Sequence, residues 1–186
     1  MTVHLSPAEV APAILSFWFD EVGRDRWFAR NEALDAEIRR RFSKVRESVL
    51  ADRARRWRDT PEHLLAAILL LDQCSRNLHR GSAKAFEADA LALELLRLAL
   101  ARGWVDEAPA DWRQFLLMPL MHSEDMADQD RSVAEFAKLG DPENLRFAHL
   151  HREQVLRFGR FPGRNQALGR VSTAEERELI EKGETF

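Results

Sequence analysis

The sequence predicts an all-α protein, and three kinds of observation support this expectation. Several prolines follow a residue that can cap a helix, as at Ser6, Thr60 and Asp141, so they fit the first helical position, where a missing N–H group costs nothing. Capping boxes are expected over Ser6–Glu9 and Ser172–Glu175. Glycines occur where helices should end in the left-handed conformation. Between these marks apolar residues recur every three or four positions, and no segment alternates with the period of two that indicates a strand.

About eight helices follow from this pattern. They are expected at about 7–19, 31–52, 61–79, 83–102, 109–126, 128–139, 142–158 and 173–182. The third helix is apolar on all sides through Leu71, which predicts a central position in the fold. Pro119 should kink or split the fifth. Short connections favour antiparallel neighbours, so we expect helical hairpins in a single domain over residues 1–186.

The charge balance argues against one class of function and favours one kind of contact. A formal net charge of −3 speaks against a nucleic-acid partner, which would need a basic domain or a basic face. The cations are 24 Arg against 4 Lys. Arg is the better residue for two-point pairing with carboxylate or phosphate groups. A GC-rich genome that favours Arg codons is the alternative explanation for this surplus.

Cysteine use and hydropathy predict where the protein is found. The one cysteine, Cys74, excludes an internal disulfide framework and fits a reducing compartment. The N-terminal segment MTVHLSPAEVAPAIL has neither a basic region nor a long apolar core, so no signal peptide is expected. The longest apolar run, Leu64–Leu71, is far shorter than the roughly 20 residues that span a membrane. We therefore expect a soluble, cytoplasmic protein without a membrane partner.

An arginine-rich segment, HREQVLRFGRFPGRNQALGR at residues 151–170, is the most unusual part of the chain. It starts as a helix and continues beyond Gly159 as a loop. So many cations among apolar residues need anionic partners, from a ligand or from the protein's own carboxylates. The polar residues concerned are Arg157, Arg160, Arg164, Asn165 and Arg170, and Phe158 and Phe161 are expected to anchor the loop in the core.

A second polar cluster ends the apolar run of the third helix. Asp72 follows the core leucines on one face, so it is expected at the margin of the core. A buried carboxylate without a partner is costly, and Arg76, one turn on, is the near candidate. The arginines of residues 157–170 are candidate partners for Asp72 from a distant part of the sequence. Asp72, with Gln73, Arg76 and Asn77, is therefore either a buried salt bridge that locks this helix to the loop, or part of a ligand site.

A third cluster, MPLMHSEDM at residues 118–126, follows the expected kink at Pro119. His122 and Asp125, with Glu124 between them, could form an acid/base pair or supply two metal ligands. The spacing is not the HExxH of a zinc-binding helix, so no metal site is expected. A polar ligand pocket and an ordinary hydrogen-bonded histidine are the alternatives.

Other catalytic patterns are missing from the sequence. His149 and His151 lie two residues apart on a helix, so they point to opposite sides and cannot hold one metal ion together. His151 is expected at the margin of the core. There is no GxSxG elbow and no phosphate-binding glycine loop, and Cys74 lies in a buried helix without an identifiable base. No cofactor is expected.

Four stretches of the chain carry a resemblance to a known family. They are Trp27-Phe28, LLLDQCSRNLHRGSAKAFEAD, LMPLMHSEDMADQDRSV and HREQVLRFGRFPGRNQALGRVSTAEE. Over residues 10–182 the chain thereby resembles the domain-of-unknown-function family 924. The family pattern reads DQFPRN and FPHRN, where this chain has Cys74-Ser75 and Gly163, and the missing histidine argues against a mechanism that needs an imidazole at Gly163. The resemblance implies tetratricopeptide-like helical hairpins and no established activity, substrate or catalytic residue.

The first hypothesis for function is a non-enzymatic helical binding protein for an anionic peptide or small anionic ligand. Stacked antiparallel helices leave a concave groove, and guanidinium and amide groups are suited to an anion. The residues expected to contact the ligand are Asp72, Arg76, Asn77, His122, Arg157, Arg160, Arg164 and Asn165.

Two other hypotheses compete with it. In the second, a hydrolase or transferase uses His122 as the general base, and a carboxylate from Glu124, Asp125 or Asp72 orients it or holds a divalent cation. In the third, the polar clusters pair with one another and close the helical array without any site there. That hypothesis sets Asp72, Glu124 and Asp125 against Arg157, Arg160 and Arg170.

Overall fold

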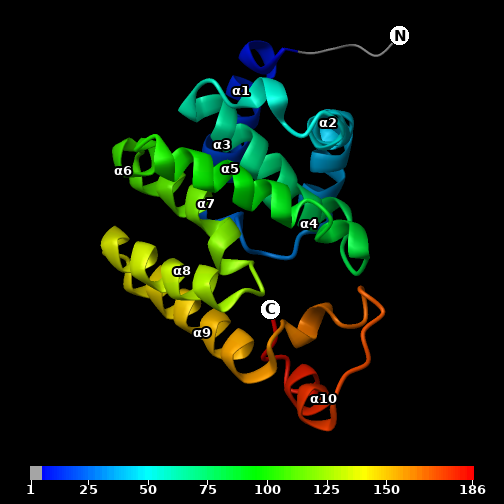
Figure 1. Cartoon of the computed structure of the whole chain (residues 1–186). Helices are drawn as coiled ribbons and strands as arrows, with labels where there is room; N and C mark the ends of the chain where they lie inside the picture. The colour runs from blue at the N-terminus through cyan, green and yellow to red at the C-terminus, as the bar shows by residue number, and fades with distance from the viewer. Residues whose placement is uncertain (1–5) are drawn as a thin grey trace. The chain divides into compact units, whose positions relative to one another are not determined.

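A computed structural model of the chain describes residues 6–186, and over these residues it is helical without any strand (Figure 1), so the predicted all-α class is confirmed. The α-helices are α1 Pro7–Ser16, α2 Glu32–Ala51, α3 Pro61–Leu69, α4 Ser75–Leu78, α5 Asp89–Ala101, α6 Trp104–Glu107, α7 Ala110–Met121, α8 Met126–Leu139, α9 Pro142–Phe158 and α10 Ala174–Glu181. Two π-helical segments, η1 Phe17–Val22 and η4 Leu70–Cys74, follow α1 and α3 directly. Short 3-10 turns occupy Arg24–Arg26, Arg55–Trp57, Ala83–Ala85 and Pro162–Arg164.

The chain divides into two compact units. The first comprises Lys84–Leu116 together with the chain up to Arg80, and the second comprises Gly81–Ala83 and Leu117–Phe186. The single domain expected over residues 1–186 stays a prediction. Residues 1–5, part of the segment in which no signal peptide is expected, lie outside the described residues.

The first unit is organised around the continuous helical path of α3, η4 and α4, which is the helix predicted at 61–79. The run from Leu64 to Leu71 is fully buried, as its apolar composition predicts. α1 and α5 pack against α3, and α2 packs against η4 and α4. Thr60 caps α3 as expected, because its side chain accepts the N–H of His63.

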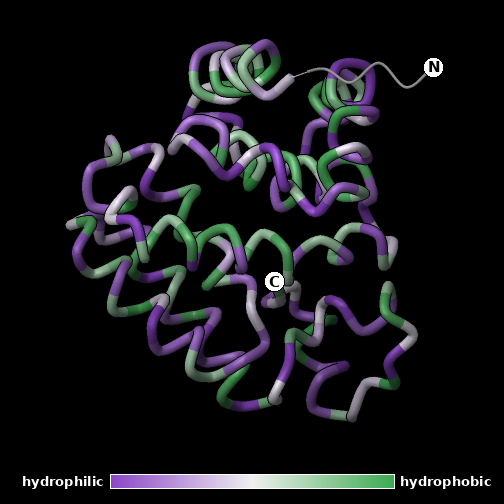
Figure 2. The backbone as a smooth tube through the Cα atoms, turned by 45° about the horizontal axis from the view of Figure 1, so that its top comes forward, coloured by the Kyte–Doolittle hydropathy of each residue, from purple (hydrophilic) through white to green (hydrophobic). Residues whose placement is uncertain are grey.

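The second unit is built on the hairpin of α8 and α9, which lie side by side and run in opposite directions (yellow to orange in Figure 1). α9 has the predicted bounds, with Asp141 as its N-cap and Gly159 in the left-handed conformation at its end (φ 67°). Hydrophobic and hydrophilic residues alternate along both helices (Figure 2), and Phe136 and Val155 are among the residues they bury. Each helix therefore hides one apolar face.

Several helix boundaries differ from the sequence prediction. The helix predicted at 83–102 starts only at Asp89, after a 3-10 turn at Ala83–Ala85, and the short helix α6 was not predicted. The fifth predicted helix, 109–126, ends already at Met121, two residues after Pro119, and Asp125 caps a new helix that starts at Met126. The last capping box starts at Thr173 and uses Glu176, one residue later than predicted. The sequence STAEE fits both registers, and the buried contacts of Glu176 select the later one. None of the helices described over residues 6–186 has the length and apolarity that crossing a membrane requires.

Candidate functional site

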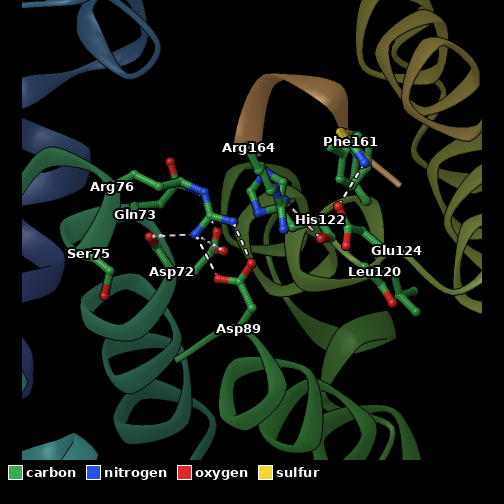
Figure 3. Close-up of polar contacts among 12 residues, drawn as sticks. Asp72, Gln73, Ser75, Arg76, Asp89, Leu120, His122, Glu124, Phe161 and Arg164 are labelled. Carbon is green, nitrogen blue, oxygen red and sulfur yellow. Dashed lines mark hydrogen bonds and ion pairs between the residues drawn. The ribbon is translucent and has the colours of Figure 1, made fainter. Parts of the chain in front are cut away.

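Asp72 forms the centre of a polar cluster in the first unit (Figure 3). It lies in the π-helical segment η4, and it is 0% exposed, which corrects the expectation of a place at the margin of the core. Its carboxylate accepts a hydrogen bond from the side-chain amide of Gln73 at 2.6 Å and forms an ion pair with the guanidinium group of Arg76 at 2.8 Å. The near partner expected from the sequence is therefore confirmed.

Arg76 holds a second carboxylate as well. Its Nη1 and Nη2 atoms donate to Asp89 at 3.1 Å each, so one guanidinium group joins η4 to the start of α5. Burial lowers the pKa of Arg76, but the two carboxylates outweigh this effect and the pKa is raised. Arg76 thus stays charged and fixes both acidic side chains.

Asn77 belongs to a separate group of contacts in the first unit. Its side chain donates to Asp35 at 2.7 Å, and Arg80 pairs with the same carboxylate at 2.5 Å and 2.9 Å. Burial raises the pKa of Asp35, but the hydrogen bonds from Arg80 and Asn77 outweigh it and lower the pKa. These contacts tie α4 to α2, so Asn77 has a structural role.

Glu124 forms the centre of a cluster in the second unit. Its carboxylate accepts two hydrogen bonds from Arg170, at 2.8 Å and 3.0 Å. It also accepts one from the backbone N–H of Phe161 at 2.7 Å (Figure 3). Burial raises its pKa, but these hydrogen bonds outweigh that effect and lower it. The pairing of Glu124 with Arg170, expected under the structural hypothesis, is confirmed.

Arg160 and Arg157 pair with glutamates of α10, which were not among the carboxylates expected to bind them. Arg160 binds both carboxylate oxygens of Glu176, at 2.7 Å and 2.8 Å, and its hydrogen bonds lower the pKa of Glu176 to about 2. Arg157 pairs with Glu175, and both side chains are 55% exposed. The structural hypothesis is therefore right that protein carboxylates hold these arginines, but it named the wrong carboxylates. The capping-box pattern STAEE was the available signal for these glutamates.

Asp125 and Asn165 are also used by the structure. Asp125 accepts the backbone N–H groups of Ala127 and Asp128 as the N-cap of α8, at 2.8 Å and 3.2 Å. Asn165 is buried and donates to the hydroxyl group of Ser172 at 3.0 Å. Asp125 thus caps the start of α8, and the bond between Asn165 and Ser172 joins two positions of the loop between α9 and α10.

Arg164 differs in its surroundings from the other loop arginines. Its guanidinium group donates to the backbone carbonyl of His122 at 2.9 Å and lies over the ring of Phe161, 4.6 Å from the centroid. The residue is 8% exposed. His122 and His151 have ring centroids 6.1 Å apart, and His151 packs on Phe161 at 5.6 Å. We call Arg164, His122, His151 and Phe161, which these contacts link, the imidazole–guanidinium cluster.

The tautomer of His151 follows from one contact in this cluster. Its Nδ1 atom lies 2.8 Å from the backbone carbonyl of Phe147, which can only accept, so Nδ1 carries the proton. His151 is buried, although the sequence pattern indicates a place at the margin of the core. Over residues 6–186 no group of three or more His, Cys, Asp or Glu side chains is arranged to hold a metal ion.

A small groove in the first unit was not anticipated from the sequence. It measures about 210 Å³ and lies beside η1 and the start of α2. Apolar side chains meet two carboxylates there, and the lining includes Phe17, Val22, Leu34, Glu21 and Glu37. Arg41 pairs with Glu21 at 2.6 Å and Arg40 pairs with Glu37 at 2.6 Å, so both acidic groups already have partners. The groove is also below the roughly 300–1,000 Å³ of ordinary ligand pockets.

The fold and these clusters define an all-helical protein whose polar side chains are bound mainly to one another. The chain belongs to the bacterial family of proteins of unknown function 924, whose model matches residues 14–184, so the resemblance seen in the motifs is confirmed. A solved structure of a protein of unknown function from Agrobacterium tumefaciens is similar, with a TM-score of 0.90 and 37% identity over 96% of this chain and 100% of that one. No curated protein matches the chain.

Proposed function

We propose that the protein is a non-enzymatic binding protein for a small anionic ligand, and that the imidazole–guanidinium cluster recognises the anion. The observation that supports this proposal is that the guanidinium group of Arg164 and the ring of His151 both contact Phe161. His122 joins them through its ring, 6.1 Å from that of His151, and through its backbone carbonyl, which accepts from Arg164. Guanidinium and imidazole groups are suited to carboxylate and phosphate oxygens. The helical hairpins, which we take to be of the tetratricopeptide-like kind, would hold these groups in place.

The outer arginines are not part of the proposed site. Arg160 and Arg170 each bind a glutamate at two points, and Arg157 binds Glu175 at the surface. We assign these three residues to the closure of the loop. Within the arginine-rich segment, the proposed site uses Arg164, which contacts Phe161 and the backbone of His122.

Titration calorimetry with inorganic phosphate, and separately with acetate, tests the proposal and distinguishes phosphate from carboxylate ligands. Replacing Arg164→Gln removes the cation while keeping a polar side chain, and we expect the affinity for the bound probe to fall roughly 10- to 100-fold, the loss expected for a charge-assisted hydrogen bond. Arg157→Gln, in the exposed pair with Glu175, is the matched control and should bind as the unmodified protein does.

Two results would overturn the proposal. One is that neither anion binds the unmodified protein, and the other is that Arg164→Gln binds as tightly as the control. Should Arg164→Gln not fold, Arg164→Lys keeps the charge but loses the planar two-point geometry, and it should bind more weakly than the unmodified protein.

A further inference from the structure

The segment Glu184–Phe186 returns from the end of α10 and lies against α9. The ring of Phe186 stacks on the imidazole of His151, with centroids 3.7 Å apart and planes inclined by 23°. Phe147 meets the same ring edge-on, with centroids 6.4 Å apart. One face of His151 is therefore covered by a residue that follows the last helix.

The backbone of this segment is held by a buried side chain. Gln154, one turn after His151 on α9, donates its Nε2 hydrogen to the carbonyl of Glu184 at 2.6 Å. The other side of Gln154, its Oε1 atom, is buried without a hydrogen-bond partner. The amide is thus oriented so that its N–H group, and not its carbonyl oxygen, makes the hydrogen bond to residues 184–186.

Gly163 makes room for the same segment from the loop. A Cβ atom at this position would lie 2.6 Å from the backbone oxygen of Phe186, closer than real contacts allow, and 3.0 Å from Cβ of Thr185, which is a tight contact. Its φ is outside the left-handed region, so the backbone of Gly163 does not itself require glycine. The absence of a side chain is needed for the close approach of residues 184–186.

We propose that Glu184–Phe186 is a detachable strap that covers His151 and limits access to the imidazole–guanidinium cluster. The proposal rests on the binding function proposed above. The contacts of the strap are weak ones: Phe186 stacks on His151 and meets Phe147 edge-on, and Gly163 makes room for its backbone. Two hydrogen bonds add to these contacts, from Gln154 to the carbonyl of Glu184 and from the N–H of Glu184 to the carbonyl of Leu179. Phe186 keeps 36% of its surface exposed. Contacts of this kind shift an equilibrium by roughly 10- to 100-fold, so the strap favours the closed state without fixing it.

The closed strap should weaken the measured affinity of the cluster for an anion. When only a fraction of the molecules is open, the measured dissociation constant is raised by the inverse of that fraction. Releasing the strap should therefore increase the affinity for an anion by up to roughly 10- to 100-fold. It should also expose the ring of His151 to reagents.

Two variants release the strap by different means. Phe186→Ala removes the stacking ring, and Gly163→Ala places a methyl group where the strap backbone lies. Gln166→Ala, at an exposed position of the same loop, is the control. The measurements are the rate of His151 modification by diethyl pyrocarbonate, read by mass spectrometry, and the affinity for inorganic phosphate. His149, which is exposed on the same helix, reports the intrinsic reactivity of a histidine in each sample.

We expect diethyl pyrocarbonate to modify His151 at least about tenfold faster in both strap variants than in the control. Both variants should also bind phosphate more tightly, and the modification rate of His149 should be unchanged. If the rate of His151 modification is unchanged in both variants, the strap proposal is overturned, whether or not phosphate binds. Faster modification with unchanged phosphate affinity would overturn its control of access. If neither phosphate nor acetate binds the unmodified protein or the variants, the proposed binding function falls, while faster His151 modification still supports the strap as a cover. The two variants act independently, so one that fails to fold leaves the other as the test.

Discussion

The guanidinium group of Arg160 holds the carboxylate of Glu176 at two points, with Nε–Oε1 at 2.7 Å and Nη2–Oε2 at 2.8 Å. Glu176 is 1% exposed, and it also accepts the backbone N–H of Thr173 at 2.7 Å. The preceding residue, Glu175, makes an exposed pair with Arg157. Two consecutive glutamates at the start of α10 therefore form one buried and one exposed ion pair.

Replacing Glu176→Gln should destabilise the protein much more than replacing Glu175→Gln. The first change leaves Arg160 uncompensated beside a buried site, and we expect a loss on the order of 3 kcal/mol, near the low end for a broken buried pair because the Arg160 side chain stays 27% exposed. The second breaks an exposed pair, which is worth about 0–1 kcal/mol. Urea unfolding of the two variants measures the difference, and equal losses would contradict it.

The same carboxylate should make stability fall in acid. The pKa of Glu176 is lowered from 4.5 to about 2 in the folded protein. As the pH falls, the unfolded chain therefore takes up the proton first, so the contribution of Glu176 is complete above about pH 4.5 and is lost progressively toward about pH 2.

The unfolding free energies of the unmodified protein and Glu176→Gln should consequently converge as the pH falls from about 5 to about 3. Urea-unfolding midpoints across this range provide the measurement. A difference that stays constant with pH would show that Glu176 does not titrate in this window.

Removing the cation of the Asp72 cluster should be more costly than removing a surface cation of the same unit. Arg76→Met leaves Asp72 buried next to Asp89 without the guanidinium group that joins them, and we expect a loss on the order of 3–5 kcal/mol. Arg53→Met, which breaks an exposed pair with Glu94, should cost no more than about 1 kcal/mol. Thermal and urea unfolding compare the two, and a small loss for Arg76→Met would show that Asp72 does not depend on this cation.

Cys74 should react with thiol reagents only when the protein unfolds. Its side chain is buried in η4, and burial raises the pKa of the thiol to about 12. Because the thiolate is the reactive form, a native sample at neutral pH should label very slowly and a urea-unfolded sample should label at the rate of a free thiol. Fast labelling of the native protein would mean that η4 opens locally. The chain has one cysteine, so the labelling signal comes from this position alone.

The local signals in the sequence predicted most of the helices but missed several boundaries, including the start of α5 at Asp89. The proline and its preceding cap placed the start of α9, and the left-handed glycine placed its end, because these contacts involve only neighbouring residues. The predicted helix at 109–126 was too long because its apolar spacing continued past the point where Asp125 caps a new helix. The capping box of α10 was placed one residue early because STAEE fits two registers and only the burial of Glu176 decides between them.

The sequence by itself determined the all-α class and the buried path through Leu64–Leu71, because helix periodicity and capping are short-range properties. The family followed from the resemblance of four motif stretches. The sequence also predicted the partner of Asp72, since Arg76 lies one turn away on the same helical path. Only the tertiary structure decided how the loop arginines are used. An ion pair between residues 16 or 46 positions apart, as in Arg160–Glu176 and Arg170–Glu124, depends on how helices and loops pack, and no local pattern records that distance. For the same reason the stacking of Phe186 on His151 and the close approach at Gly163 became visible only in the folded chain.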